Sequence, residues 1–255
     1  MSHLVLLAQN TFRESLRDRL LAILMLFGVV FTAAAVLIAP LTLGQSERIV
    51  RDLGLSAIGL FTTMMIIMVG TGMVWREIER RTILTILAHP VGRPSFILGK
   101  FFGLYGTVLV SIGVLGLFYL GVVALFGGGF EPHLVLAIAM IALEAAIVTA
   151  VAVLFSSVAS PLLSAVFTTL VWAAGHMAFD LKMLAEKANS VAVDRAVDLF
   201  YLVLPSLHHF HVRNNVLPDV PIPGSQLVWC ATYTGLYCGA VLVVTILAFG
   251  RRDFE

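Results

Sequence analysis

Residues 101–130 read FFGLYGTVLVSIGVLGLFYLGVVALFGGGF, a stretch that contains no Asp, Glu, Lys or Arg. A helix needs about 20 mostly apolar residues to cross the hydrocarbon core of a bilayer. This stretch meets that length, and it carries no charge that water would have to solvate. It therefore predicts a membrane-spanning helix.

Similar stretches recur along the chain. Two precede it, at residues 20–46 and 53–75, and a last one covers residues 220–250, where the prolines place the helix start near Gln226. A long composite from 132 to 179 is interrupted by Glu144, and the small residues and proline at 156–161 divide it into two helices. The sequence thus predicts an all-α integral membrane protein of six transmembrane helices, with residues 1–255 forming one domain.

The composition supports a membrane location. Of the 255 residues, 60% are apolar and 12% are charged, whereas soluble domains carry about 25% charged residues. The net charge of +1 argues against nucleic acid as a partner, because that role calls for a strongly basic face. Cys230 and Cys238 are separated by about 12 Å of helix, too far for a disulfide between them.

Basic residues in the short flanking segments set the expected orientation. With the N-terminus inside, the inner flanks hold the larger share of Lys and Arg, including the cluster between spans two and three. Positive residues favour the cytoplasmic side. Both termini are therefore expected in the cytoplasm.

Three segments lie outside the predicted spans. Residues 4–19 are amphipathic at helical spacing and predict a helix lying in the membrane interface, with Leu4, Leu7, Ala8, Phe12 and Leu16 on its apolar face. Residues 76–98 form a charged cytoplasmic insert. Residues 180–225 form a long outer segment whose apolar runs are compatible with short re-entrant helices.

The cytoplasmic insert combines a helix with a sharp return. Its acidic and basic start favours a helix with Ile83, Ile86 and Leu87 on one face, and Pro90 ends that helix before Gly92 and Pro94 turn the chain back. Such an element can dock into a groove of a cytoplasmic partner. The alternative is an ordinary loop whose arginines only mark the inner side.

This insert resembles that of the ABC-2 type permeases. The pattern Glu77-x-Glu79-x-x-Thr82, an apolar run, Pro90-x-x-Arg93 and Gly99-Lys100 is similar to the permeases of nitrous-oxide-reductase maturation and gliding-motility systems. The N-terminal segment 10–19 and the long outer segment between spans five and six resemble that family as well.

The resemblance implies a larger machine in a bacterial cytoplasmic membrane. Two permease copies, or one copy and a close homologue, would pair with two P-loop ATPase subunits, which bind the ATP and Mg²⁺. This chain would be no enzyme and hold no cofactor, and it has no G-x-x-x-x-G-K-[ST] loop. Membrane lipid and an outer-face accessory protein are the other expected partners. The residues implied to couple to the ATPase are Glu77, Glu79, Thr82, Ile83, Leu87, Pro90 and Arg93.

A few polar residues inside the spans are candidates for a translocation path. Glu144 is a carboxylate within span four, and carboxylates at that depth are costly and often functional. The alternative is a packing hydrogen bond to a neighbour such as a span-five Thr. Trp172 and His176, one turn apart in span five, either line the same path or anchor the helix at the boundary. Residues 173–175 are small enough for close approach of a second copy.

The outer histidines and two other functions complete the alternatives. His208, His209 and His211 either bind a metal or sit as polar residues at the mouth of the bundle. A secondary transporter would show more intramembrane charges and repeated halves. A membrane subunit that transmits force without transport could use the same scaffold.

Overall fold

The computed structural model describes residues 3–38, 46–79, 92–126, 132–188, 204–210 and 224–250, and every regular element among them is helical. This confirms the all-α prediction. The α-helices are α1 (His3–Leu16), α2 (Arg19–Ile38), α3 (Ser46–Met65), α4 (Met73–Glu79), α6 (Arg93–Phe126), α7 (Pro132–Val158), α8 (Pro161–Ala188) and α10 (Gly224–Gly250). A π-helical turn, η2 (Ile66–Gly70), follows α3, and a 3-10 turn, η3 (Leu207–Phe210), precedes α10.

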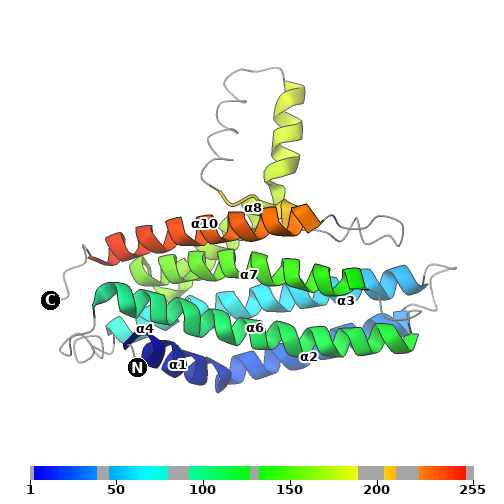
Figure 1. Cartoon of the computed structure of the whole chain (residues 1–255), viewed down its shortest axis with the longest axis horizontal. Helices are drawn as coiled ribbons and strands as arrows, with labels where there is room; N and C mark the ends of the chain where they lie inside the picture. The colour runs from blue at the N-terminus through cyan, green and yellow to red at the C-terminus, as the bar shows by residue number, and fades with distance from the viewer. Residues whose placement is uncertain are drawn as a thin grey trace.

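Six helical segments among the described residues are long and apolar enough to cross a membrane, which confirms the predicted number. They are Arg19–Ile38, Ile49–Trp75, Arg93–Phe126, Pro132–Val158, Pro161–Ala178 and Gly224–Gly250. In Figure 1, α2, α3, α6, α7 and α10 run side by side, with α1, α4 and the C-terminal end of α10 at the same end of the bundle. The expected break in the long composite falls between Val158 and Pro161, where proline opens α8 at a position that needs no amide hydrogen.

Helix α6 begins earlier than the sequence predicted. Its 34 residues extend from Arg93, two turns before the charge-free stretch starts, and reach roughly 50 Å at 1.5 Å per residue. Pro94 is compatible with this start because the first helical turn needs no intrahelical amide donor. As a consequence, Lys100 lies inside a continuous helix and is almost fully buried.

The N-terminal helix α1 packs along the first half of α6. An added Cβ on Gly103 would lie 2.5 Å from Thr11 Cβ and 2.6 Å from the Ala8 carbonyl oxygen, so only glycine permits this approach. The buried side chains of α1 are Thr11 and Ser15, while Leu16 is exposed. The expected helix over 4–19 ends at Leu16, and the Asp18 carboxylate accepts the Leu20 amide at 2.9 Å, which starts α2.

Span two is composite. The chain widens into η2 after Met65, and Thr71 donates both its amide (3.4 Å) and its hydroxyl (2.5 Å) to the Ile67 carbonyl. Gly70 lies against α6, since a Cβ there would sit 2.8 Å from Leu104 Cδ2. The sequence predicted one uninterrupted helix over this stretch and did not reveal the π-helical turn.

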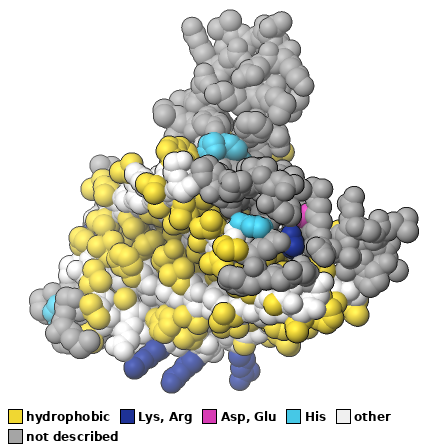
Figure 2. Space-filling model, turned by 45° about the vertical axis from the view of Figure 1, so that its right-hand side comes forward, with side chains coloured by type: hydrophobic (Ala, Val, Ile, Leu, Met, Phe, Trp, Pro, Cys, Tyr) yellow, Lys and Arg dark blue, Asp and Glu magenta, His cyan; other side chains and the backbone are white. Residues whose placement is uncertain are grey.

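The outward surface of the bundle is hydrophobic. Figure 2 shows apolar side chains over much of the described face, basic side chains along its lower edge and a further basic side chain beside a histidine nearer the centre. Large apolar residues stand almost fully outward on several spans, among them Leu37, Leu117, Leu125, Leu162 and Leu236. Such a surface suits lipid and not water.

The outer segment is described only in part. Helix α8 continues to Ala188, with its last turns projecting beyond the other helices in Figure 1, and η3 packs against α8. A Cβ on Gly175 would lie 2.6 Å from the Pro205 carbonyl oxygen. Gly175 therefore permits a close contact within the chain, and the predicted approach of a second copy at residues 173–175 stays a prediction. The rest of the expected re-entrant region lies outside the described residues.

Candidate functional site

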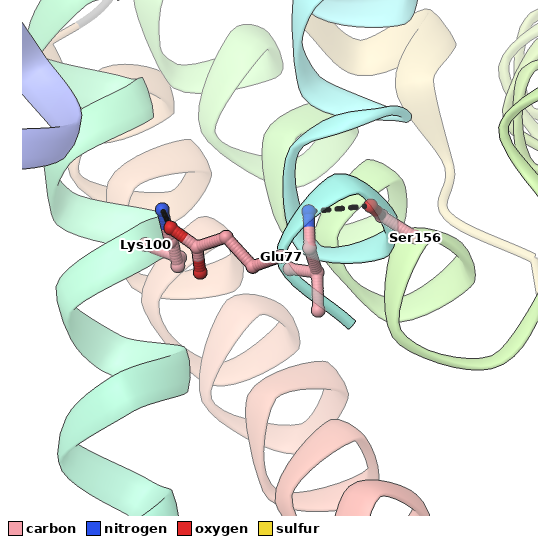
Figure 3. A network of polar contacts seen from close by, with 4 residues as sticks. Glu77, Lys100 and Ser156 are labelled. Carbon is pink, nitrogen blue, oxygen red and sulfur yellow. Dashed lines mark hydrogen bonds and ion pairs between the residues drawn. The ribbon is translucent and has the colours of Figure 1, made fainter. Parts of the chain in front are cut away.

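Helix α4, which leads into the cytoplasmic insert, forms polar contacts with two other helices, α6 and α7. The Glu77 carboxylate lies 2.6 Å from Lys100 Nζ of α6, and the Val74 amide donates to Ser156 Oγ of α7 at 3.1 Å (Figure 3). The Lys100 side chain is 2% exposed and that of Glu77 is 19% exposed. A lysine so deeply buried needs an opposite charge, because an unpaired one would be strongly destabilising.

The C-terminal end of the insert, at Arg93, is also bonded to a neighbouring helix. Arg93, the first residue of α6, donates from its guanidinium to the carbonyl oxygen of Gly250 at the end of α10. The Phe96 ring stacks on Phe249 of α10 with centroids 5.7 Å apart, and Lys100 Nζ lies 5.8 Å from the centre of the same Phe96 ring. The guanidinium is well placed at a helix C-terminus, where unsatisfied carbonyls carry partial negative charge.

A second cluster lies halfway along the spans. Glu144 of α7 faces two side chains of α8: Trp172 Nε1 donates to Glu144 Oε1 at 3.3 Å, and His176 Nε2 lies 3.4 Å from the same oxygen. The His176 ring also contacts its own helix, with Nδ1 3.0 Å from the Trp172 carbonyl oxygen. The neighbours of Glu144 are thus an indole and an imidazole of span five, and not a threonine hydroxyl.

These three residues border one pocket of about 310 Å³. Its other walls come from α2, α3, α7 and η3 and are largely apolar, including Phe31, Leu60, Ile141 and Phe210. Pockets that bind small molecules are typically apolar with a few convergent polar groups, and they start at roughly 300 Å³. The cluster therefore has the size and the chemistry of a ligand site.

The outer histidines pack with aromatic side chains. The rings of His208 and His209 have centroids 3.7 Å apart, and His209 meets Trp229 of α10 edge-on at 5.0 Å. Burial lowers the pKa of His209, since it disfavours the charged imidazolium. Within the described part of the chain, no three His, Cys, Asp or Glu side chains gather where they could hold a metal ion. His211 lies outside that part.

The chain matches the family model for "ABC-2 family transporter protein" over residues 5–254. It belongs to the ABC-2 transporter family. A search of curated proteins found no match. As an ABC-2 permease it is a multi-pass membrane component without catalysis of its own, and its family works with an ATPase subunit. The more specific likeness to nitrous-oxide-reductase maturation and gliding-motility permeases stays a prediction.

Among the coupling residues predicted from the ABC-2 resemblance, the structure describes the side chains of only two, Glu77 and Arg93, which flank the insert. Glu77 and Arg93 are described, and both are bonded within the chain. Glu79 ends α4, but its side chain is outside the described part. The remaining four, Thr82, Ile83, Leu87 and Pro90, also lie outside the described residues.

The sequence analysis predicted no contact for three residues of this ABC-2 permease that link its helices in the structure, namely Phe96, Lys100 and Ser156. Lys100 was noted only as part of a family motif, although a lysine beside a long apolar run signals a need for a buried partner. Phe96 and Ser156 gave no such signal, because an aromatic ring or a serine in an apolar helix has many structural uses. Their contacts depend on which helices are neighbours.

Proposed function

We propose that this chain is the permease subunit of an ABC transporter that moves a substrate across the cytoplasmic membrane of a bacterium. Two copies of a separate P-loop ATPase supply ATP hydrolysis with Mg²⁺. The proposal rests on one observation: both ends of the cytoplasmic insert are bonded to the helix bundle. Glu77 forms an ion pair with Lys100, and Arg93 donates a hydrogen bond to the Gly250 carbonyl. A movement imposed on the insert would be passed to α6, α7 and α10 and not absorbed by a loose loop.

The insert itself is proposed as the docking element. Glu79, Thr82, Ile83, Leu87 and Pro90 are then the contact residues toward the ATPase. Glu77 has a different part, because its carboxylate is already engaged with Lys100. It would align α4 with the bundle while the residues C-terminal to it meet the partner.

Truncating Leu87 to Ala should weaken binding of the ATPase. Loss of one well-buried anchor in an interface costs about 2 kcal/mol, which is roughly 30-fold in Kd. The affinity of the purified chain in nanodiscs for its ATPase, which we expect to be encoded in the neighbouring reading frame, measures this directly. Reversing charge with Glu79→Arg should act in the same direction.

The matched control is Leu125→Ala, which removes the same atoms from a leucine that is 80% exposed near the other end of α6. It should leave the affinity unchanged. Wild-type affinity in both the Leu87 and the Glu79 variants would show that the insert does not dock to the ATPase.

Both termini and the insert are proposed to face the cytoplasm, as the basic flanks indicate. In intact cells, Gly128→Cys should react with a membrane-impermeant maleimide, and Arg80→Cys should react only after permeabilisation. The native thiols add little background because Cys230 and Cys238 are buried. Labelling of Arg80→Cys, but not Gly128→Cys, in intact cells would invert the proposed topology.

The functional unit is proposed to be a dimer, of two copies or of one copy with a close homologue, meeting through spans two and five. Both spans carry outward apolar side chains that a second copy could cover, namely Leu60, Met64 and Met68 in span two and Leu163, Val166 and Leu170 in span five. In this arrangement the pockets bordered by Glu144, Trp172 and His176 would belong to the translocation path.

A further inference from the structure

We propose that the pocket bordered by Glu144 and Trp172 binds an uncharged amphiphile with a hydroxyl head and an apolar body, of the kind that dissolves in a bilayer. The inference deepens the proposed function and rests on it only where the ligand is regarded as cargo. Binding itself needs no ATPase, and it holds for either protonation state of Glu144.

The pocket lies between α3 and α8, which both pack on α7. Its base is one face of α7, where Ala137, Ile141 and Glu144 recur at helical spacing. The wall on α3 also follows one helix face, formed by Leu53, Ser56, Gly59, Leu60 and Thr63. The site is thus built mainly on packed helices, which hold a pocket more precisely than loops do.

Gly59 leaves room in the α3 wall. A Cβ built at this position would meet nothing within 4 Å, although the residue lines the pocket. Gly54 of the same helix differs, because a Cβ there would lie 2.3 Å from the Tyr119 ring. Glycine weakens a helix interior, and at position 59 it permits no close helix contact in return. What it provides there is volume inside the pocket.

The pocket opens onto the apolar outward surface of the bundle. Phe31 and Leu60, which line it, are each 43% exposed, and Phe27 and Met64, one turn along the same helices, are exposed as well. An apolar surface of this kind suits lipid. The proposed dimer contact includes Leu60 but not Phe31, so the α2 side of the opening would stay toward the bilayer. An apolar ligand can therefore enter from the membrane.

The polar groups inside the pocket suit a hydroxyl head. Trp172 Nε1 donates to Glu144 Oε1 at 3.3 Å, and no described residue donates a hydrogen bond to the second carboxyl oxygen, Oε2. The Glu144 side chain is only 13% exposed, and a missing hydrogen bond is costly where water has little access. A hydroxyl both donates and accepts, so it can bond to this side chain as a carboxylate or as a carboxylic acid. Thr63, which is 7% exposed, adds a hydroxyl of its own to the lining.

A charged head is disfavoured on two grounds. None of the described residues that line the pocket is Lys or Arg, so a phosphate or carboxylate head would find no permanent positive charge. A charge of either sign would also have to leave the headgroup region for the depth of Glu144, where charged groups are costly. An uncharged hydroxyl avoids both costs.

The test uses 3-azioctanol, an eight-carbon alcohol with a photoreactive diazirine at its third carbon, near the hydroxyl. The full chain in nanodiscs is irradiated at increasing mole fractions of this probe in the bilayer, and mass spectrometry locates and quantifies the labelled residues. We expect labelling at residues 59–63 and at Glu144 to saturate. Labelling at Leu236, which is 72% exposed on α10, should instead rise in proportion to the mole fraction.

Competition with unlabelled compounds defines the head group. Octan-1-ol should displace the probe from the pocket, whereas octane, octyltrimethylammonium and octanesulfonate should each need about ten times its mole fraction or more. All four share the eight-carbon chain and differ only in the head. Displacement by octane or by either ion as effective as that by octan-1-ol would overturn the proposal, and so would labelling of the pocket that never saturates.

A steric variant tests the location. Gly59→Leu fills the pocket from the α3 wall, where the added Cβ has room, and should abolish saturable labelling. Gly113→Leu is the matched control, because a Cβ there also meets nothing within 4 Å and the position does not line the pocket. It should be labelled like the wild type. Saturable labelling of folded Gly59→Leu at the wild-type level would overturn the proposal.

Two substitutions at Glu144 separate hydrogen bonding from charge. Glu144→Gln keeps a donor and an acceptor and should retain the advantage of octan-1-ol over octane, whereas Glu144→Leu should abolish it. Equal loss in both variants would make charge the determinant and contradict an uncharged ligand bound through hydrogen bonds. Where a variant fails to fold, the competition on the wild type decides.

These outcomes are separate from those for the ATPase. Saturable binding of the alcohol together with unaltered ATPase affinity in Leu87→Ala and Glu79→Arg would keep the pocket and remove the proposed coupling. Weakened ATPase binding in those variants without saturable labelling of the pocket would keep the permease and remove this ligand class.

Discussion

Replacing Lys100 with Met should lower the free energy of unfolding by about 3 kcal/mol, because it removes one partner of a buried ion pair and leaves the Glu77 carboxylate behind. The estimate lies at the lower end for such changes, since Glu77 keeps 19% exposure and can turn toward the polar interface. Methionine preserves the length and most of the volume of the side chain. Denaturation in mixed micelles, followed by tryptophan fluorescence, measures the difference.

A double-mutant cycle separates the ion pair from the packing. Adding Glu77→Gln to Lys100→Met removes the stranded charge and should recover a large part of the lost stability. Arg17→Met is the control, because Arg17 is an exposed cation on the same side of the bundle, and surface changes are usually within about 0.5 kcal/mol. Strictly additive effects of the two substitutions would contradict an interaction between Glu77 and Lys100.

Replacing Gly103 with Leu should detach α1 from α6 and cost about 3 kcal/mol, the upper range for overpacking. The added Cβ would meet the Ala8 carbonyl oxygen at 2.6 Å, and a backbone atom cannot swing aside as a side-chain end can. The whole of α1 would have to move. Unfolding in mixed micelles gives the stability, and limited proteolysis near residues 3–16 reports whether α1 remains docked.

Gly113→Leu is a matched control for that experiment. Gly113 lies further along the same helix, and nothing approaches within 4 Å of the position of its missing Cβ. The same change there should keep α1 protected from protease and leave stability equal or slightly higher, because glycine is a poor helix former. Equal loss of stability at both positions would mean that the close approach of α1 is not what Gly103 provides.

The spans were predictable because a bilayer imposes one simple requirement on them. An apolar stretch of about 20 residues is readable without knowing any neighbour, and Pro161 marks a break that depends only on local geometry. The start of α6 was not readable in this way. Its first two turns carry Arg93 and Lys100, and they are helical because α10 and α4 supply partners for those charges.

Helix α1 also shows that the sequence of one helix does not reveal how its neighbour packs against it. Its periodicity predicted a helix correctly, but the face that packs is centred on Thr11 and Ser15 and not on the largest apolar residues. The reason lies in α6, where Gly103 lets the Thr11 side chain and the Ala8 carbonyl of α1 approach its backbone closely. A pattern on one helix cannot report the shape of the helix that receives it.

The membrane pocket was partly foreseen. A lone carboxylate in an apolar span identified Glu144, and the one-turn spacing of Trp172 and His176 grouped them, but nothing in the sequence joined these residues across two helices. The contribution of Phe210 from η3 was also hidden, because a four-residue turn in a long outer segment has no periodicity to detect.

The π-helical turn of span two sets the angle at which the chain leaves the membrane. Each residue of an α-helix rotates the next by about 100°, and a π-turn accommodates one extra residue without rotating the helix beyond it. If residues 66–70 became α-helical at constant length, Glu77 would swing about 100° around the axis, away from Lys100. A relative one residue shorter here would instead keep the same facing with a plain α-helix. The number of residues in this one turn therefore determines the direction around the helix axis in which the cytoplasmic insert leaves span two. A hydropathy profile does not detect this difference.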